Sequence, residues 1–269
     1  MIPYPQIGPD IVALGPIHIR WYGMSYLMGF FLGYLLLKKR NVETGLKLDQ
    51  ELLADFAFYI FLGVILGGRL GYVLFYHPML YLTHPEEILY IFRGGMSFHG
   101  GMIGTWIAGY LFCKKHGIHF YRLADAVIPA IPIGLGLGRL GNFINGELWG
   151  RPTDVPWAMV FPMDPTGLPR HPSQLYEFGL EGVLIFTILM AMRRLPLPPG
   201  FLFWSFVTLY AMARITSEFF REPDAHLAFL FSQITAGMLL SLPMLVVGIV
   251  MLVVLGWRKD RGTNLPAAS

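Results

Sequence analysis

The chain has 269 residues, of which 55% are hydrophobic and 14% charged, and its mean hydropathy is +0.54. Soluble domains carry about 25% charged residues, so this composition excludes an ordinary soluble protein and indicates an integral membrane protein. The net charge of +3 is small and its basic residues lie between apolar runs, so we expect no nucleic-acid partner.

Seven apolar segments are each close to the ~20 residues that span a hydrocarbon core. We therefore predict an all-α polytopic membrane protein that forms one catalytic domain over residues 1–269. The predicted transmembrane helices cover about 20–37, 52–75, 96–113, 121–140, 175–192, 200–219 and 233–256.

Basic residues set the predicted orientation of these helices. All six lysines follow the odd-numbered segments: Lys38, Lys39, Lys47, Lys114, Lys115 and Lys259. The positive-inside rule places those loops in the cytoplasm, which gives a periplasmic N-terminus and a cytoplasmic C-terminus. The even-numbered loops, which hold arginine and histidine but no lysine, then face the outer side.

Residues 1–19 form the first outer region, which we expect to be a periplasmic or interfacial arm. Its first residues lack the basic region of a signal peptide, so no cleavable signal is predicted. Trp21 and Tyr22 follow the arm, and aromatic side chains of this kind suit the depth of the lipid headgroups.

Glycines recur through the second segment at Gly63, Gly67, Gly68 and Gly71. Small residues at this spacing allow helices to pack closely, and Arg69 lies among them. Arg69 either extends towards the interface or is paired inside the bundle; the glycines favour pairing because such faces point towards protein.

A histidine between glycine pairs stands at the entry to the third segment, in Arg93-Gly94-Gly95-Met96-Ser97-Phe98-His99-Gly100-Gly101. Such an imidazole is approachable by a substrate. It could equally be a helix-entry residue that is hydrogen-bonded to the backbone. The residues alone are compatible with both interpretations.

A stretch of thirteen residues at the end of the fourth apolar run, residues 138–150, concentrates polar groups at a membrane boundary. It has the pattern GRxGNFxNxExxG. Polar side chains are costly there and usually serve a function. The outer loop that follows, residues 141–174, is too long for a simple connection and rich in proline and glycine, so we expect a small folded head. It ends in the string RHPSQLYE (170–177), where His171 either contacts a ligand or braces the loop together with Arg170.

The sixth segment carries polar residues at helical spacing. Tyr210, Arg214 and Glu218 recur every four residues and Arg221 follows three later, so the four share one helix face near its outer end. An arginine and a glutamate four residues apart can form a structural salt bridge. Within a membrane, however, charges tend to face a cavity or a partner, so we expect Arg139 and Arg214 to converge in one outward-facing cavity.

Five places in the chain together resemble the bacterial phosphatidylglycerol:prolipoprotein diacylglyceryl transferases. They are the tyrosine of the first segment, the His-Gly-Gly element, the 138–150 pattern, RHPSQLYE and the polar face of the sixth segment with the following Arg-Glu-Pro-Asp. The resemblance implies transfer of the sn-1,2-diacylglyceryl group of phosphatidylglycerol to the lipobox cysteine of a prolipoprotein signal peptide, with formation of a thioether and release of glycerol phosphate. It also implies a multi-pass protein of the bacterial inner membrane, surrounded by membrane lipid, with its active site towards the periplasmic leaflet.

This chemistry can be compared with the residue types present. A free thiol has a pKa near 8.5 and attacks as the thiolate, so a base or a positive potential must activate it. Negative charge develops on the departing phosphate, which the fixed donor fork of arginine suits better than lysine. No metal or cofactor is expected, because the histidines and Cys113 show no ligand spacing.

The candidate residues follow from the resemblance and this chemistry. His99 is the candidate base, Arg139 and Arg214 hold the phosphate, and Glu147 and Glu218 orient the arginines or the glycerol hydroxyls. The other candidates supply hydroxyls (Tyr22, Tyr210), amides (Asn142, Asn145), a permissive turn (Gly150) and secondary substrate contacts (Arg69, Arg221 and His171).

Alternatives from other classes are a transporter for an anionic lipid or solute and a non-catalytic membrane scaffold. A transporter predicts repeated halves and a polar path to the cytoplasm, whereas the polar residues here gather at the outer end. A scaffold predicts that Arg139→Lys is tolerated. A transferase for a different lipid headgroup is the nearest enzymatic alternative.

Overall fold

The computed structural model describes residues 2–5, 7–8, 10–14, 17–75, 78–90, 95–222 and 235–263. The side chains of 13–14, 17–18, 98–99, 236 and 258–263 lie outside this description. Internal contacts divide the chain into two compact units, Lys38–Leu123 and a second unit made of Met1–Leu37 and Ala124–Ser269. Each unit is described by itself.

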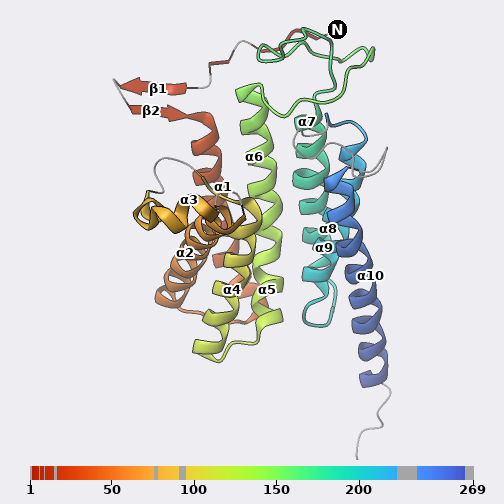
Figure 1. Ribbon diagram of the computed structural model, residues 1–269. Coiled ribbons are helices and arrows are strands. Elements are labelled where there is room, and N and C mark those ends of the chain that lie inside the picture. Colours follow the sequence, from red (N-terminus) through yellow and green to blue (C-terminus); the bar gives the residue numbers. More distant parts are fainter. Residues whose placement is uncertain are drawn as a thin grey trace, which may run out of the picture. The chain divides into compact units, whose positions relative to one another are not determined.

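Long helical segments in the described residues coincide with the seven apolar segments predicted from the sequence (Figure 1). Two of them change helical type along their length, the fourth through a 3-10 turn and the fifth through a π-helix. The seven are α1 (Trp21–Thr44), α2 (Gln50–Phe75), α4 (Phe98–His116), α5–η3–α6 (Phe120–Val127, Ile128–Ala130, Ile131–Asn145), α7–η4–α8 (Ser173–Glu177, Phe178–Leu184, Ile185–Met192), α9 (Phe201–Glu218) and α10 (Ala236–Thr263).

Four of these segments are long and apolar enough to cross a membrane by length and composition: Gln50–Phe75, Phe120–Asn145, Ser173–Met192 and Gly237–Trp257. Much of the surface of these helices consists of exposed large side chains such as Leu74, Val183 and Val246. Exposed apolar helix surface on this scale suits lipid contact. The mainly helical membrane class is therefore confirmed, and spanning by all seven segments stays a prediction.

The outer arm contains a short antiparallel hairpin that we did not predict. Strand β1 (Asp10–Leu14) pairs with β2 (Ile17–Arg20), with Asp10 opposite Arg20 and Leu14 opposite Ile17. The pairing is irregular between Asp10 and Val12. Strand β1 (DIVAL) is apolar after its first residue and does not alternate, and β2 (IHIR) alternates over only four residues, so neither gave a clear strand pattern in the sequence.

The unit of residues 38–123 is built on close packing of α2 against α4. A Cβ atom on Gly63 would lie 2.7 Å from the carbonyl oxygen of Gly104, and one on Gly71 would lie 2.7 Å from Cα of Gly100. These helices can therefore approach so closely only because glycine has no side chain at the contact. The prediction that the second segment packs through its glycines is confirmed. A short helix, α3 (Pro78–Thr83), and a 3-10 turn, η1 (Pro85–Leu89), also belong to this unit.

In the other unit, α1 packs against α6 through small residues. A Cβ atom on Gly29 would lie 3.1 Å from Cα of Gly134, and one on Gly141 would lie 3.3 Å from Cα of Tyr22. This contact places the start of α1, including Tyr22, beside the end of α6 that carries the 138–150 pattern.

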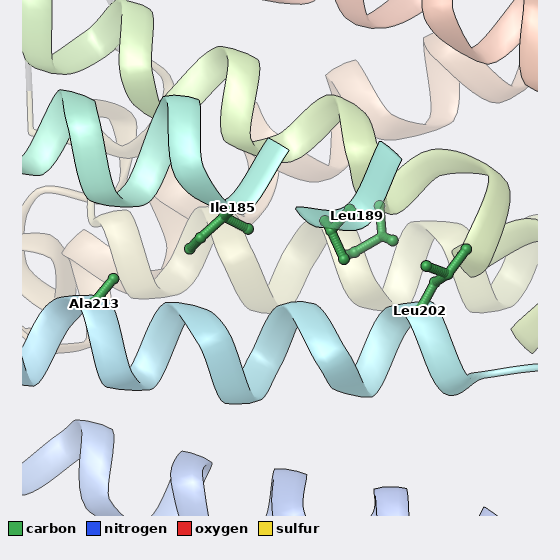
Figure 2. Close-up of a cluster of buried hydrophobic side chains, with 5 residues drawn as sticks. Ile185, Leu189, Leu202 and Ala213 are labelled. Carbon is green, nitrogen blue, oxygen red and sulfur yellow. The ribbon is translucent and has the colours of Figure 1, made fainter. Parts of the chain in front are cut away.

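The apolar core of this unit lies between α8 and α9. Figure 2 shows Ile185 and Leu189 of α8 directed towards Leu202 and Ala213 of α9, and Ile128 of η3 joins the same cluster. Asp125 fixes the N-terminal end of α9, because its carboxylate accepts hydrogen bonds from the backbone N–H groups of Gly200 (2.6 Å) and Phe203 (2.9 Å). Helix α10 then runs alongside α9 (Figure 1).

The segment after α6 packs around an apolar cluster, and it begins later than the predicted start at residue 141. Helix α6 continues to Asn145 rather than residue 140, and Gly146 ends it in the left-handed conformation at φ 68°. The head is then held by Phe143, Met159 and Phe161, with Tyr4 and Trp149 packed against them. The first half of the 138–150 pattern is therefore helical, so its polar side chains have fixed directions.

Candidate functional site: an arginine–glutamate cluster between helices

A close crossing of α6 and the π-helix η4 positions the first part of the candidate site. A Cβ atom on Gly182 would lie 2.8 Å from Cα of Gly136, so two glycines meet at the crossing. Arg139, one turn further along α6, reaches the carboxylates on the facing segment. Its Nη1 lies 3.2 Å from Glu177 Oε2, and its Nε and Nη2 each lie 3.1 Å from Glu181 Oε2.

Helix α9 brings a second arginine to the same carboxylates. Arg214 Nη1 lies 2.8 Å from Glu177 Oε1 and 3.9 Å from Glu181 Oε1, and its Nη2 lies 2.5 Å from Glu218 Oε1. Arg221, just beyond α9, places Nη1 3.4 Å from Glu177 Oε1. The glutamate at 177 therefore contacts three guanidinium groups, and Arg139 and Arg214 come together there.

We call Arg139, Arg214, Arg221, Glu177, Glu181 and Glu218 the arginine–glutamate cluster. Its three arginines and three glutamates balance in formal charge, as buried charges within a membrane protein require. Exposure within the cluster is uneven. The side chains of Glu177 and Glu181 are 0% exposed, whereas those of Arg139 and Arg214 are 16% and 15% exposed. The carboxylates of Glu177 and Glu181 are thus more deeply buried than the two arginines that contact them.

Glu177 and Glu181 are the cluster members that sequence reasoning missed. Glu177 stood in the RHPSQLYE string without a role, and Glu181 was not singled out. A signal was present, because two carboxylates four residues apart interrupt an otherwise apolar segment, and ionisable residues in such segments usually face the bundle interior. The π-helix Phe178–Leu184 that contains Glu181 is a second structural marker, since π-helical turns often occur at functional sites.

The polar residues after Arg139 form their own hydrogen-bond group. Asn142 and Asn145 both donate through Nδ2 to Glu147 Oε1, at 2.9 and 3.3 Å. Gln174 donates to the backbone carbonyl of Glu147 at 2.6 Å. Glu147 is thus held by the two amides of the pattern, which fixes the turn where α6 enters the head.

Both candidate tyrosines lie close to the charged residues. Tyr22 lies where α1 meets α6, against Gly141, and its hydroxyl is 2.9 Å from that of Tyr26. Tyr210 lies one turn before Arg214 on α9, and its ring stacks on Phe206 with the centroids 5.8 Å apart. The two tyrosines thus lie on helices that approach or carry the arginines.

His171 is held inside the head. Its ring packs edge-on against Phe220 with the centroids 5.3 Å apart, and its Nδ1 lies 3.1 Å from the Tyr176 hydroxyl. Trp157 donates to the same hydroxyl oxygen, so the tyrosine hydrogen is free to be donated to a neutral His171. Burial lowers the pKa of the His171 imidazole, which agrees with a neutral ring. Gly150 is packed against it, since a Cβ atom there would lie 2.7 Å from Cβ of His171.

Arg170, the neighbour of His171, ties the head together. It pairs with Asp164, and its Nη1 lies 3.1 Å from Glu222 and 3.2 Å from the carbonyl oxygen of Gly150. Burial would raise the pKa of the Asp164 carboxyl, but hydrogen bonds from Arg170 and Thr166 hold that pKa below its usual range. We call Arg170, Asp164 and Glu222 the head cluster. Arg151 links the head to the end of α9 by donating to the carbonyl oxygens of Arg221 and Glu218.

Two candidates belong to the unit of residues 38–123. Arg69 is buried and donates to the carbonyl oxygens of Ile88 (2.8 Å), Glu87 (2.5 Å) and Gly95 (3.1 Å), with its guanidinium above the Tyr81 ring. Arg69 is thus buried and paired, but the hydrogen-bond partners just named are carbonyl oxygens of the segment between α3 and α4 and not side chains of the helix bundle. His99 is the second residue of α4, and its side chain lies outside the described part of the chain.

The fold and the cluster define an integral membrane protein that holds several charged side chains between apolar helices, as proteins acting on charged substrates at membranes do. A family model described as prolipoprotein diacylglyceryl transferase matches residues 9–254. The chain belongs to the prolipoprotein diacylglyceryl transferase family.

Relatives of similar length support this membership. A protein of Geobacter sulfurreducens is 50% identical over 95% of this chain and 98% of its own length. One of Bordetella avium is 50% identical over 97% and 99%, and one of Pseudomonas syringae pv. syringae is 48% identical over the full length of both. Each of these relatives is named phosphatidylglycerol–prolipoprotein diacylglyceryl transferase.

Proposed function

We propose that this protein transfers the sn-1,2-diacylglyceryl group of phosphatidylglycerol to the lipobox cysteine of a prolipoprotein signal peptide, the first step of lipoprotein maturation. Family membership and nearly full-length relatives of that name support the activity. The observation that carries the assignment of the site is the meeting of Arg139 and Arg214 at Glu177, with the two arginine side chains 16% and 15% exposed and that of Glu177 0% exposed.

The reaction exchanges one carbon–oxygen bond for one carbon–sulfur bond. The cysteine thiolate attacks the glycerol carbon that carries the phosphate ester, a carbon–sulfur bond forms and the carbon–oxygen bond to phosphate breaks. The phosphate oxygen takes the electron pair, and glycerol phosphate leaves. Negative charge therefore accumulates on the phosphate in the transition state.

Arg139 and Arg214 suit that charge for two reasons. A guanidinium keeps its charge and offers donors in a fixed fork, and the carboxylates behind it hold the fork in place before substrate arrives. Donors fixed in this way are commonly worth about 2.7–4 kcal/mol each at a developing anion. Glu218, 2.5 Å from Arg214, orients that arginine.

The remaining roles form part of the same proposal. Asn142 and Asn145 hold Glu147 and with it the turn at Gly146, while Tyr22 and Tyr210 supply hydroxyls beside the arginines. His99 stays the proposed acceptor of the thiol proton, and Arg69, Arg221, Gly150 and His171 stay proposed secondary contacts with the substrate. The chain acts as one domain of seven membrane-spanning helices in the bacterial inner membrane, and the site faces the periplasmic leaflet.

The test uses purified protein in detergent with phosphatidylglycerol and a lipobox peptide. We expect the peptide to gain the mass of one diacylglyceryl group while an equal amount of glycerol phosphate appears. A peptide with serine in place of its cysteine should remain unmodified, and phosphatidylethanolamine should not replace phosphatidylglycerol. Folded protein that leaves the cysteine peptide unchanged would refute the activity, and equal use of both lipids would indicate a different headgroup specificity.

A further inference from the structure

Helix α10 contacts the arginine–glutamate cluster through a residue without a side chain. A Cβ atom on Gly237 would overlap Oε1 of Glu218 and lie 2.6 Å from its Cδ. That same Oε1 is the atom 2.5 Å from Arg214 Nη2. The space that any larger residue would fill is therefore occupied by the carboxylate that pairs with Arg214.

The first atoms that a Cβ on Gly237 would meet all belong to the Glu218 side chain: Oε1, Cδ and, at 3.2 Å, Cγ. A flexible side chain can rotate away from such a clash at little cost, whereas backbone cannot. The expected response to a methyl group at this position is thus a displaced carboxylate in a folded protein. Glu218 is 4% exposed, so its carboxylate has little room to find another place on Arg214.

A second glycine on α10 makes a comparable contact away from the cluster. A Cβ atom on Gly248 would overlap the Thr208 hydroxyl and lie 3.3 Å from the Thr208 backbone nitrogen. Thr208 donates its hydroxyl to the carbonyl oxygen of Trp204, one turn earlier on α9. Gly237 and Gly248 both serve the packing of α10 on α9, but only Gly237 touches a charged partner of Arg214.

We infer that Gly237 is a positioning residue for the transferase reaction: by having no side chain, it lets α10 hold the Glu218 carboxylate on Arg214. This inference rests on the proposed function. Through Gly237, helix α10 helps to orient Arg214, the proposed phosphate-binding arginine, although none of the six cluster residues lies on α10.

The test compares Gly237→Ala with its matched control Gly248→Ala, with transfer to the lipobox peptide measured per folded molecule. Misplacing a substrate-positioning group by about 1 Å can cost about 100-fold in rate, so we expect Gly237→Ala to lower kcat by about 10- to 100-fold. KM should change less, because the group is needed most where phosphate charge develops. Gly248→Ala should keep kcat within about twofold of the wild-type value even if its melting temperature falls. Its packing defect lies at Thr208, away from Arg214 and its partners, so the effect on stability should not extend to the reaction.

A double-mutant cycle with Glu218→Asp separates an effect through Glu218 from a general packing defect, because it compares kcat of the two single variants with that of the double variant. The shorter aspartate loses reach to Arg214, but it also avoids the methyl group of Gly237→Ala. If Gly237 acts through Glu218, the double variant should be no slower than Glu218→Asp alone.

Wild-type activity in Gly237→Ala, equal losses in both alanine variants, or multiplied losses in the double variant would each overturn the inference while leaving the transferase activity in place. A folded wild-type protein without turnover would instead overturn the proposed function, and this inference with it.

Discussion

The two buried arginine clusters of the larger unit use the same residue types to different ends. In the head cluster, Arg170 is 7% exposed and its three nitrogens all contact head residues, among them Asp164, Thr166 and the Gly150 carbonyl. In the arginine–glutamate cluster, the three nitrogens of Arg139 also all contact carboxylates, but the side chains of Arg139 and Arg214 are about twice as exposed, at 16% and 15%. We therefore expect the more deeply buried head cluster to stabilise the fold, and the more exposed arginines of the other cluster to bind the ligand.

Removing the Arg170 side chain should give the largest effect, and the effect should be on stability. Arg170→Ala leaves Asp164 buried without its cation, a change that typically costs about 3–5 kcal/mol. We expect a clear fall in melting temperature and in the yield of folded protein, with little change in turnover per folded molecule. Changing Asp164 to Asn together with Arg170→Met should restore part of the stability, because both buried charges are then gone. Stability unaltered by Arg170→Ala would show that the head does not depend on this cluster.

Arg139→Lys should show the opposite pattern. Lysine preserves the charge beside Glu177 and Glu181, but it loses the fork whose Nε and Nη2 contact Glu181. We expect kcat to fall by about 10²–10³-fold, as for removal of one preorganised donor, with a melting temperature near that of the wild type. Arg20→Lys, at an exposed pair with Asp10, is the matched control and should keep full activity. A fully active Arg139→Lys protein would favour a scaffold role for the cluster.

Glu177→Gln tests whether the carboxylate behind the arginines positions them. The amide group replaces one oxygen by a donor that repels an arginine, so Arg139, Arg214 and Arg221 lose their common anchor. We expect kcat to fall about tenfold or more, equivalent to about 1.4 kcal/mol, with a smaller change in KM. Glu43→Gln, at the Arg40–Glu43 pair of α1, provides a control with the same chemical change. Equal effects of the two changes would remove Glu177 from the site.

Acid should produce the smallest effect through His171. Its folded-state pKa lies below the ordinary value near 6.5, so the unfolded chain takes up the proton first as pH falls. The stability contribution is therefore complete above about pH 6.5 and is lost as pH falls through the lower folded-state value. Melting temperatures between pH 7.5 and pH 5 should decline less in His171→Phe, which retains the ring packing against Phe220. Parallel declines in both proteins would assign the acid sensitivity to other groups.

Much of the fold was predictable because hydropathy directly reports helices of membrane length. Each predicted segment overlaps a helical segment, although α1 continues to Thr44 and α10 to Thr263, beyond the predicted ends at 37 and 256. The glycines of α2 correctly indicated close packing. The β1–β2 hairpin was missed because β1 is apolar without alternation after Asp10, and the alternation of β2 covers only four residues. The extension of α6 to Asn145 was also missed, since four glycines in the 138–150 pattern obscure the helical signal.

The candidate site was only partly visible in the sequence. The four-residue spacing of Tyr210, Arg214 and Glu218 identified one face of α9, and the pair between Arg214 and Glu218 is present. Charge balance across helices depends on tertiary packing, which a sequence does not display, and so Glu177 and Glu181 were not predicted. The contact of Gly237 with Glu218 is of the same kind, because the important feature is an absent side chain on another helix.

The most direct test of this account measures the affinity for glycerol phosphate, the expected product, without peptide present. Isothermal titration calorimetry would compare wild type, Arg214→Lys and Arg170→Lys under identical detergent conditions. We expect binding at least about tenfold weaker in Arg214→Lys and within about twofold of wild type in Arg170→Lys, because only Arg214→Lys removes forked, charge-assisted contacts to the phosphate. Equal affinities in all three proteins, or a loss confined to Arg170→Lys, would contradict the assignment of the arginine–glutamate cluster as the phosphate site.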